Sequence, residues 1–232
     1  MILYVNGDSH AAAAQAVNRF SFANDDINHI ALGRKPHPDN LRMSWGMRLS
    51  KLLGLGLKCD AESGSSNARI LRTTRDFVND LPSLGNPYTV IVIGWSTWER
   101  KEFWHADSRE WLQFAAGGMF KGIHEDLYKK YILDLDYDKD EAQCHSDIYD
   151  LHIELKQKNI PHLFFNAMWH FRSNLDLDWH GNYLEPYDPD WSYMEWAFQN
   201  KFGERNQHYG PDAHRLWADV LFSRLTDMLE SV

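Results

Sequence analysis

Short apolar runs alternate with longer amphipathic stretches along this chain. The β-branched, apolar run Tyr88–Ile93 is typical of a strand that helices cover on both faces. The predicted strands are Ile2–Val5, Leu55–Cys59, Tyr88–Ile93 and His162–Phe165. The predicted helices are Met43–Leu53, Ala68–Asp80, Ser108–Phe120, Asp140–Lys158 and a C-terminal helix from Pro211. The alternation predicts an α/β fold with a mostly parallel sheet between helix layers, while 24–40 and 166–190 are expected to be loops.

Composition narrows the function classes. A chain of 232 residues can form one domain, and we expect 1–232 to be a single domain. The formal net charge of −9 disfavours nucleic acid or an anionic membrane as a partner. The two cysteines indicate a reducing compartment, and neither a signal peptide nor a membrane span is visible, so a cytoplasmic location is expected. The sequence leaves the oligomeric state open.

An aromatic-rich segment near 166–200 is predicted to be an insertion in this domain. Its rings are Trp169, Trp179, Tyr183, Tyr187, Trp191, Tyr193 and Trp196. Two interpretations stay open. The rings form the core of an inserted cap, or they form a platform beside the functional site, because flat rings stack on sugars and line apolar pockets.

In a parallel sheet, ligands bind beyond the carboxyl ends of the strands. The first strand is followed there by GDSH, residues 7–10. Ser9 has two interpretations at this point. It belongs to a turn in which Gly7 relaxes the backbone and Asp8 or Ser9 caps a helix from about Ala11, or it is a nucleophile exposed at the sheet edge. Later loops carry AESGSSNAR, GWSTWER and ERNQHYGPDAH, all of which suit acyl chemistry.

In order and spacing, these blocks resemble the SGNH hydrolases, also called GDSL-type esterases. The resemblance implies a three-layer α/β/α sandwich of flavodoxin-like type with about five strands. It makes Ser9 the nucleophile and His208 the base. It places Ser9, Gly64 and Ser96 in the oxyanion hole. A serine needs such a base to lose its proton, and the oxyanion needs donors aimed at it.

Two positions depart from the pattern of that family. Ser96 stands where the family has Asn, so Asn67 or Arg100 is the alternative oxyanion donor. Arg205 stands where the family has the Asp of a triad, which leaves a Ser-His dyad, or a triad with Glu204. Asn67, Trp95 and Arg100 flank these positions, and they are the predicted substrate-binding residues.

The expected function is hydrolysis of an ester, with an O-acetylated carbohydrate as the candidate substrate and without cofactor or metal. The histidines show no metal-ligand spacing. The rival enzymatic interpretation is a phosphodiester or thioester hydrolase of the same fold. The rival from another class is a carbohydrate-binding module with little or no catalysis, and the missing Asn and Asp support it.

Overall fold

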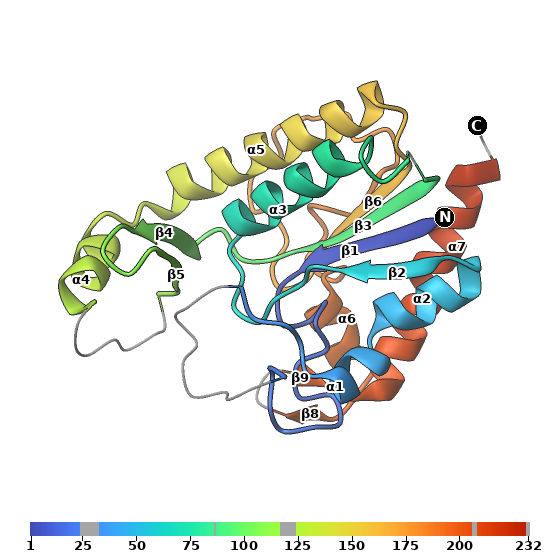
Figure 1. Cartoon of the computed structure of the whole chain (residues 1–232), viewed down its shortest axis with the longest axis horizontal. Helices are drawn as coiled ribbons and strands as arrows, with labels where there is room; N and C mark the ends of the chain where they lie inside the picture. The colour runs from blue at the N-terminus through green and yellow to red at the C-terminus, as the bar shows by residue number, and fades with distance from the viewer. Residues whose placement is uncertain (24–32, 86, 117–123, 206–207, 231–232) are drawn as a thin grey trace.

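A sheet of five parallel strands crosses the centre of the molecule (Figure 1). The computed structural model describes residues 1–23, 33–85, 87–116, 124–205 and 208–230, except for the side chains of Glu204 and Arg205. The strands are β1 (Ile2–Gly7), β2 (Gly56–Cys59), β3 (Thr89–Trp95), β6 (His162–Asn166) and β7 (Tyr183–Leu184). Their order in the sheet is β2-β1-β3-β6-β7. The predicted parallel sheet is therefore confirmed.

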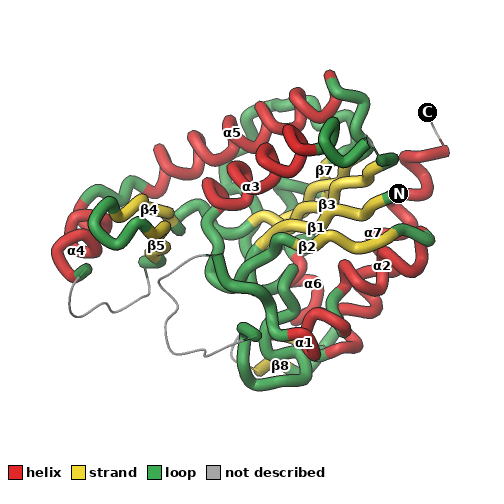
Figure 2. Tube along the Cα trace, in the orientation of Figure 1, coloured by secondary structure: helices red, strands yellow, loops and turns green. Residues whose placement is uncertain are grey.

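Helices cover both faces of this sheet. They are α1 (Pro38–Arg42), α2 (Trp45–Leu53), α3 (Asn67–Asp80), α4 (Glu125–Leu133), α5 (Tyr137–Gln157), α6 (Tyr193–Gln199) and α7 (Pro211–Glu230). Helices α3 and α5 lie on one face, and α2 and α7 lie on the other (Figures 1 and 2). The result is the predicted three-layer α/β/α sandwich. None of the helices in the described part of the chain is long and apolar enough to cross a bilayer.

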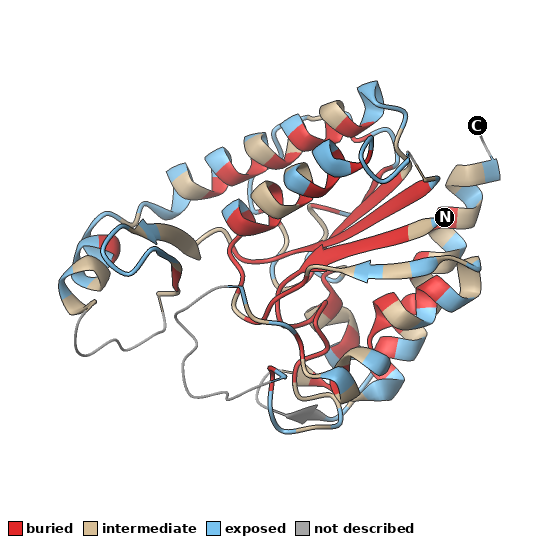
Figure 3. Cartoon of the chain, in the orientation of Figure 1, coloured by how far each residue is buried: buried red, intermediate tan, exposed pale blue. Residues whose placement is uncertain are grey.

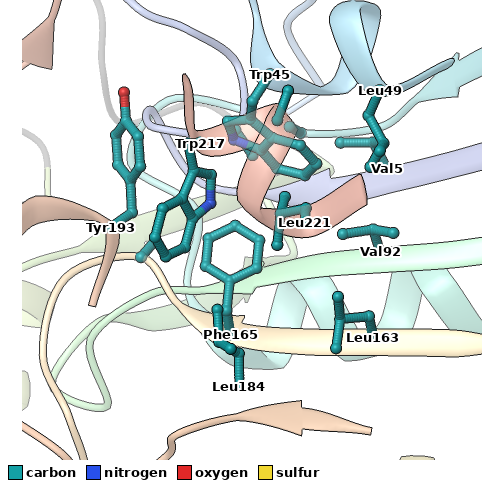
Figure 4. Close-up of a cluster of buried hydrophobic side chains, with 14 of the residues drawn as sticks. Val5, Trp45, Leu49, Val92, Leu163, Phe165, Leu184, Tyr193, Trp217 and Leu221 are labelled. Atoms are coloured by element: carbon teal, nitrogen blue, oxygen red, sulfur yellow. The ribbon is translucent and has the colours of Figure 1, made fainter. Parts of the chain in front are cut away.

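The alternation of side chains along each strand divides the core into two parts. From β1, Tyr4 points to one face and stacks on Phe77 of α3, with ring centroids 4.1 Å apart. On the other face, Phe165 of β6 lies edge-on to both Trp45 and Trp217, each 5.3 Å away between centroids (Figure 4). The strands are almost wholly buried in the middle of the sheet (Figure 3). This packing fixes the strand ends on which the functional loops stand.

The predicted helix Ser108–Phe120 is wrong. The structure instead has an antiparallel hairpin of β4 (Lys101–His105) and β5 (Glu110–Phe114), set apart from the main sheet. The reason is cross-strand pairing: Trp104 lies opposite Trp111 on one face of the hairpin, and Phe103 lies opposite Leu112 on the other face. Residues 117–123 lie outside the described residues.

The predicted helix at about Ala11 is also wrong. Residues 9–15 form successive turns, and Ala13 and Gln15 have left-handed φ angles of 52° and 60°. All four alanines, 11–14, are at most 1% exposed, so small side chains are needed to pack this turn against the sheet. In the predicted loop 24–40, α1 begins at Pro38, and residues 24–32 lie outside the described residues.

The aromatic segment contributes both to the core and to the surface. It supplies the short strand β7, which lies within the predicted loop 166–190, and the helix α6, which follows that loop. Trp179, Tyr183 and Tyr193 are buried, which favours the core interpretation for these three rings. Trp169 is different, because half of its surface is exposed.

Candidate active site

Ser9 follows the carboxyl end of β1, beside the end of β3. The last residue of β1, Gly7, pairs with Gly94 of β3 and has a φ of +150°. A Cβ on Gly7 would lie 2.6 Å from the Ala11 Cβ and 2.7 Å from the Gly94 carbonyl oxygen, so glycine is required for this close approach. Ser9 itself is only 5% exposed.

The turn that holds Ser9 is fastened by Asp8. The Asp8 Oδ1 accepts a hydrogen bond from the His10 N–H at 2.9 Å, and the Asp8 carbonyl accepts one from the Ala12 N–H at 2.9 Å. No hydrogen bond joins the Ser9 hydroxyl to any residue that the structure describes. Asp8 therefore fixes the backbone around the hydroxyl and leaves the hydroxyl itself open to another partner.

His208 comes to this edge of the sheet from the other end of the chain. A small hairpin of β8 (Glu204–Arg205) and β9 (His208–Tyr209) precedes α7 and presents it. The His208 ring lies 5.3 Å from the His10 ring between centroids. The structure thus places the predicted base next to the residue that follows the predicted nucleophile. The side chain of Glu204, the predicted third member, lies outside the described residues.

Two further histidines lie behind His208. His10 and His214 both pack against Tyr193 of α6, at centroid distances of 5.6 and 5.4 Å. Burial lowers the pKa of His10 to about 4, with Asp8 opposing and His208 and Arg100 adding to the decrease. Burial, followed by the proximity of His10 and His208, lowers the pKa of His214 to about 3. Both rings are therefore neutral near pH 7, and His214 packs in the core against Tyr193.

A buried ion pair borders the site on the side of β3. The Asp8 Oδ2 accepts from the Arg100 Nη1 at 3.0 Å and from the Ser96 hydroxyl at 3.1 Å. The Ser96 hydroxyl accepts from the same Arg100 Nη1 at 2.8 Å. Asp8 is fully buried, so Arg100 neutralises a carboxylate that would be costly to leave unpaired. In the sequence, Asp8 was singled out only as a possible helix cap.

Two of the predicted substrate-binding residues have structural partners instead. The Asn67 amide bridges the loop after β3: its Oδ1 accepts from the Ser96 N–H at 2.8 Å, and its Nδ2 donates to the Ser96 carbonyl at 2.9 Å. Trp95 is fully buried and lies edge-on to Phe164 at 5.2 Å. Trp95 therefore belongs to the core, because it has no surface that a substrate could touch.

Gly64 stands at the tip of the loop after β2, where its φ is +84°. The loop is held beside β1 by the Glu62 N–H, which donates to the Gly7 carbonyl at 3.1 Å, and by the buried Glu62–Arg69 ion pair at 2.7 Å. A Cβ at position 64 would collide with the Gln113 amide. The Gly64 N–H donates to no residue in the described part of the chain, so it is available as a donor.

Taken together, the site has a buried serine, a histidine nearby, an open backbone N–H and a fixed guanidinium at one edge of the sheet. These groups are the parts of a nucleophile, a base and an anion-stabilising pocket. Within the described residues, no group of three or more His, Cys, Asp or Glu side chains could hold a metal ion.

No protein-family model matches the chain, and no curated protein matches it in sequence. Among solved structures, it is similar to an acetyl xylan esterase from the rumen bacterium Butyrivibrio proteoclasticus, at 15% identity and a TM-score of 0.53. That match covers 99% of this chain, which spans 64% of the length of the esterase. A putative lipolytic protein of the G-D-S-L family from Desulfitobacterium hafniense matches at 12% identity and a TM-score of 0.38, over 96% of this chain and 98% of that one. With its parallel five-stranded sheet between two helix layers, the chain has the fold of the SGNH hydrolases.

Proposed function

We propose that this protein is a serine hydrolase that cleaves esters, with Ser9 as nucleophile and His208 as base. One observation carries the proposal: the His208 ring lies against His10, the residue next to Ser9, at the carboxyl edge of the sheet. His208 takes the proton of the Ser9 hydroxyl while the oxygen attacks the ester carbonyl carbon. His208 then gives this proton to the departing alcohol. Water then takes the place of the alcohol in the reverse direction. His208 takes a proton from the water as its oxygen attacks the acyl carbon, and gives this proton to the Ser9 oxygen as the acid leaves.

The backbone N–H groups of Ser9 and Gly64 are the proposed donors to the oxyanion. Neither donates to another residue in the described part of the chain. Donors fixed in a site that excludes water stabilise the transition state without having to reorganise. The neutral His10 adds no positive charge that would oppose protonation of His208.

The proposed substrate is an O-acylated carbohydrate. The loops after β3 and β6 enclose a hollow of about 240 Å³, which is lined by Thr97, Trp98, Glu99, Tyr137, Trp169, His170 and Arg172. Trp169 is 50% exposed and Tyr137 is 48% exposed, so both rings offer a face to a ligand. Aromatic faces with polar groups beside them suit a sugar ring. The similar acetyl xylan esterase adds acetyl as the candidate acyl group.

A binding module without catalysis remains the second candidate. It is favoured by the Ser96 hydroxyl, which is committed to Asp8 and Arg100, whereas the resembled family has an amide donor at this position.

Replacement of Ser9 separates the two candidates. Because the Ser9 hydroxyl has no described partner, Ser9→Ala should leave the melting temperature unchanged. The same variant should lower kcat for p-nitrophenyl acetate by at least about 10⁴-fold. Ser83→Ala, at an exposed serine, is the matched control and should keep full activity. A wild-type protein that binds sugars but hydrolyses no ester would favour the binding module, and hydrolysis by Ser9→Ala would contradict the assignment of the nucleophile. Glu204→Gln in the same assay tests the predicted third member.

A further inference from the structure

The site contains a cation whose role the proposed function does not explain. Attack by Ser9 puts a negative charge on the former carbonyl oxygen, and enzymes of this kind aim several donors at that oxygen. Beyond the two backbone N–H groups, three side chains near the end of β3 carry hydrogens that could be donated to this oxygen. They are Ser96, Asn67 and Arg100.

The Ser96 hydroxyl has no hydrogen to offer. Its oxygen lies 3.1 Å from the Asp8 Oδ2 and 2.8 Å from the Arg100 Nη1. A carboxylate only accepts and a guanidinium only donates, so the single Ser96 hydrogen must point at Asp8. This geometry therefore does not support the prediction that Ser96 donates to the oxyanion.

The Asn67 amide is committed as well. Its Nδ2 lies 2.9 Å from the Ser96 carbonyl and 3.1 Å from the Cys144 Sγ, which accounts for both amide hydrogens. Asn67 is also only 5% exposed. It holds the loop after β3 in place and cannot turn towards a substrate without losing these bonds.

Arg100 has donors left over. Only its Nη1 is engaged, by Asp8 at 3.0 Å and by Ser96 at 2.8 Å. Its Nε and Nη2 hydrogens have no acceptor among the residues that the structure describes. The side chain is 15% exposed, so the guanidinium reaches the surface of the site while Asp8, beside Ser9, anchors it from below.

On this basis we infer that Arg100 is the further donor of the oxyanion hole, and that Asp8 and Ser96 are positioning residues that hold it. The inference rests on the proposed esterase function. The planar guanidinium of Arg100 can bind Asp8 and Ser96 through one nitrogen and present another nitrogen to the substrate. A lysine has only one nitrogen and cannot divide these two tasks in this way.

The test is a kinetic comparison with p-nitrophenyl acetate. Arg100→Met should lower kcat by about 100-fold and change KM far less, because the donor acts on charge that exists only in the transition state. The matched control is Arg75→Met, which removes an arginine from an ion pair with Glu154 between α3 and α5 and should keep wild-type kcat. If Arg100→Met does not fold, Arg100→Lys takes its place. Its single nitrogen is needed by Asp8 and Ser96, so we expect kcat to fall by at least about 10-fold.

A second variant separates catalysis from support of the fold. Ser96→Asn in the Arg100→Met background restores an amide donor at the end of β3 and should recover about 10-fold of the lost kcat. A merely structural Arg100 would not be replaced in this way. The inference is overturned if the folded Arg100 variant keeps kcat within about 3-fold of wild type, or if Ser96→Asn recovers nothing. A wild-type protein without esterase activity would instead overturn the proposed function.

Discussion

The imidazole rings of His10 and His208 lie 5.3 Å apart between centroids, although one follows the first strand and the other precedes the last helix. The site is therefore complete only when the β8–β9 hairpin lies against the turn after β1. Burial keeps His10 neutral, with a pKa of about 4. A neutral ring beside His208 matters, because His208 has to accept a proton when Ser9 attacks.

Charge at position 10 should consequently control the rate. A fixed cation next to His208 disfavours the imidazolium, so His10→Lys should lower kcat by about 10-fold or more and move the acidic limb of the pH–rate profile to lower pH. His10→Gln, which stays neutral, is the control and should retain the wild-type profile. Equal profiles for the two variants would show that no electrostatic coupling joins positions 10 and 208.

Gly64→Ala should reduce both activity and stability. The φ of +84° costs an alanine about 1 kcal/mol. The new Cβ would also collide with the Gln113 amide and push the Gly64 N–H away from the site. Gly54→Ala is the matched control. Gly54 also has a left-handed φ, but an added Cβ would meet no atom within 4 Å, so this variant has only the cost of the strained backbone. The comparison is made by thermal unfolding and by kcat, and a Gly64→Ala protein as active as Gly54→Ala would exclude Gly64 from the oxyanion hole.

Trp169→Ala tests the proposed carbohydrate substrate. Loss of this half-exposed ring from the hollow that Thr97 and Trp98 also line should raise KM for acetylated xylo-oligosaccharides by about 10-fold, the value of one lost stacking contact. Its effect on p-nitrophenyl acetate should be smaller. Trp104→Ala removes a similarly exposed ring from the β4–β5 hairpin and serves as the control. If both variants bind the oligosaccharide as wild type does, the hollow at Trp169 is not a sugar subsite.

The free energy of unfolding should decrease in mild acid because of two buried, hydrogen-bonded histidines, His152 of α5 and His162 at the amino end of β6. His152 Nδ1 and His162 Nε2 are 2.8 Å apart, and the His162 Nδ1 donates to the Ile160 carbonyl at 2.9 Å. Burial is the largest cause that lowers the pKa of each ring to about 4, below the unfolded value of about 6.5. The unfolded chain therefore binds more protons between these values, and the free energy of unfolding decreases as the pH falls through this window.

The measurement is urea unfolding between pH 7.5 and 5.5, a range in which ordinary carboxylates stay ionised. The expected slope is on the order of 1 kcal/mol per pH unit for each histidine that takes up a proton. A free energy of unfolding that is flat or increases towards pH 5.5 would mean that these rings are not held neutral in the native state.

Much of the fold could be predicted because its strands and helices have strong local signals. The residues of β3 after Thr89 are all apolar, and α7 has Pro211 at its first position and apolar residues at helical spacing. The β4–β5 hairpin could not be predicted in this way. The strand conformation of Glu110–Phe114 depends on its pairing with Lys101–His105 rather than on its own sequence pattern. The turn after β1 was missed for a similar reason: its alanines favour a helix locally, but packing against the sheet imposes left-handed angles.

The candidate site divides in the same way. Ser9, Gly64 and His208 could be proposed from the sequence because each stands in a short motif after a predicted strand or before a predicted helix. The Asp8–Arg100 ion pair could not, because it depends on how the loop after β3 folds against the turn after β1. Burial of Trp95, which removes it from the substrate-binding residues, likewise follows from which face of β3 points to α3 and α5.

Covalent labelling with a fluorophosphonate, followed by mass spectrometry of the peptides, tests Ser9 as the nucleophile and His208 as its base. Such a probe reacts with a serine that a neighbouring base activates. We expect one adduct on Ser9 in the wild-type protein, a much slower reaction in His208→Ala and none in Ser9→Ala. An adduct on another serine, or labelling of Ser9 at the same rate in His208→Ala, would contradict these assignments.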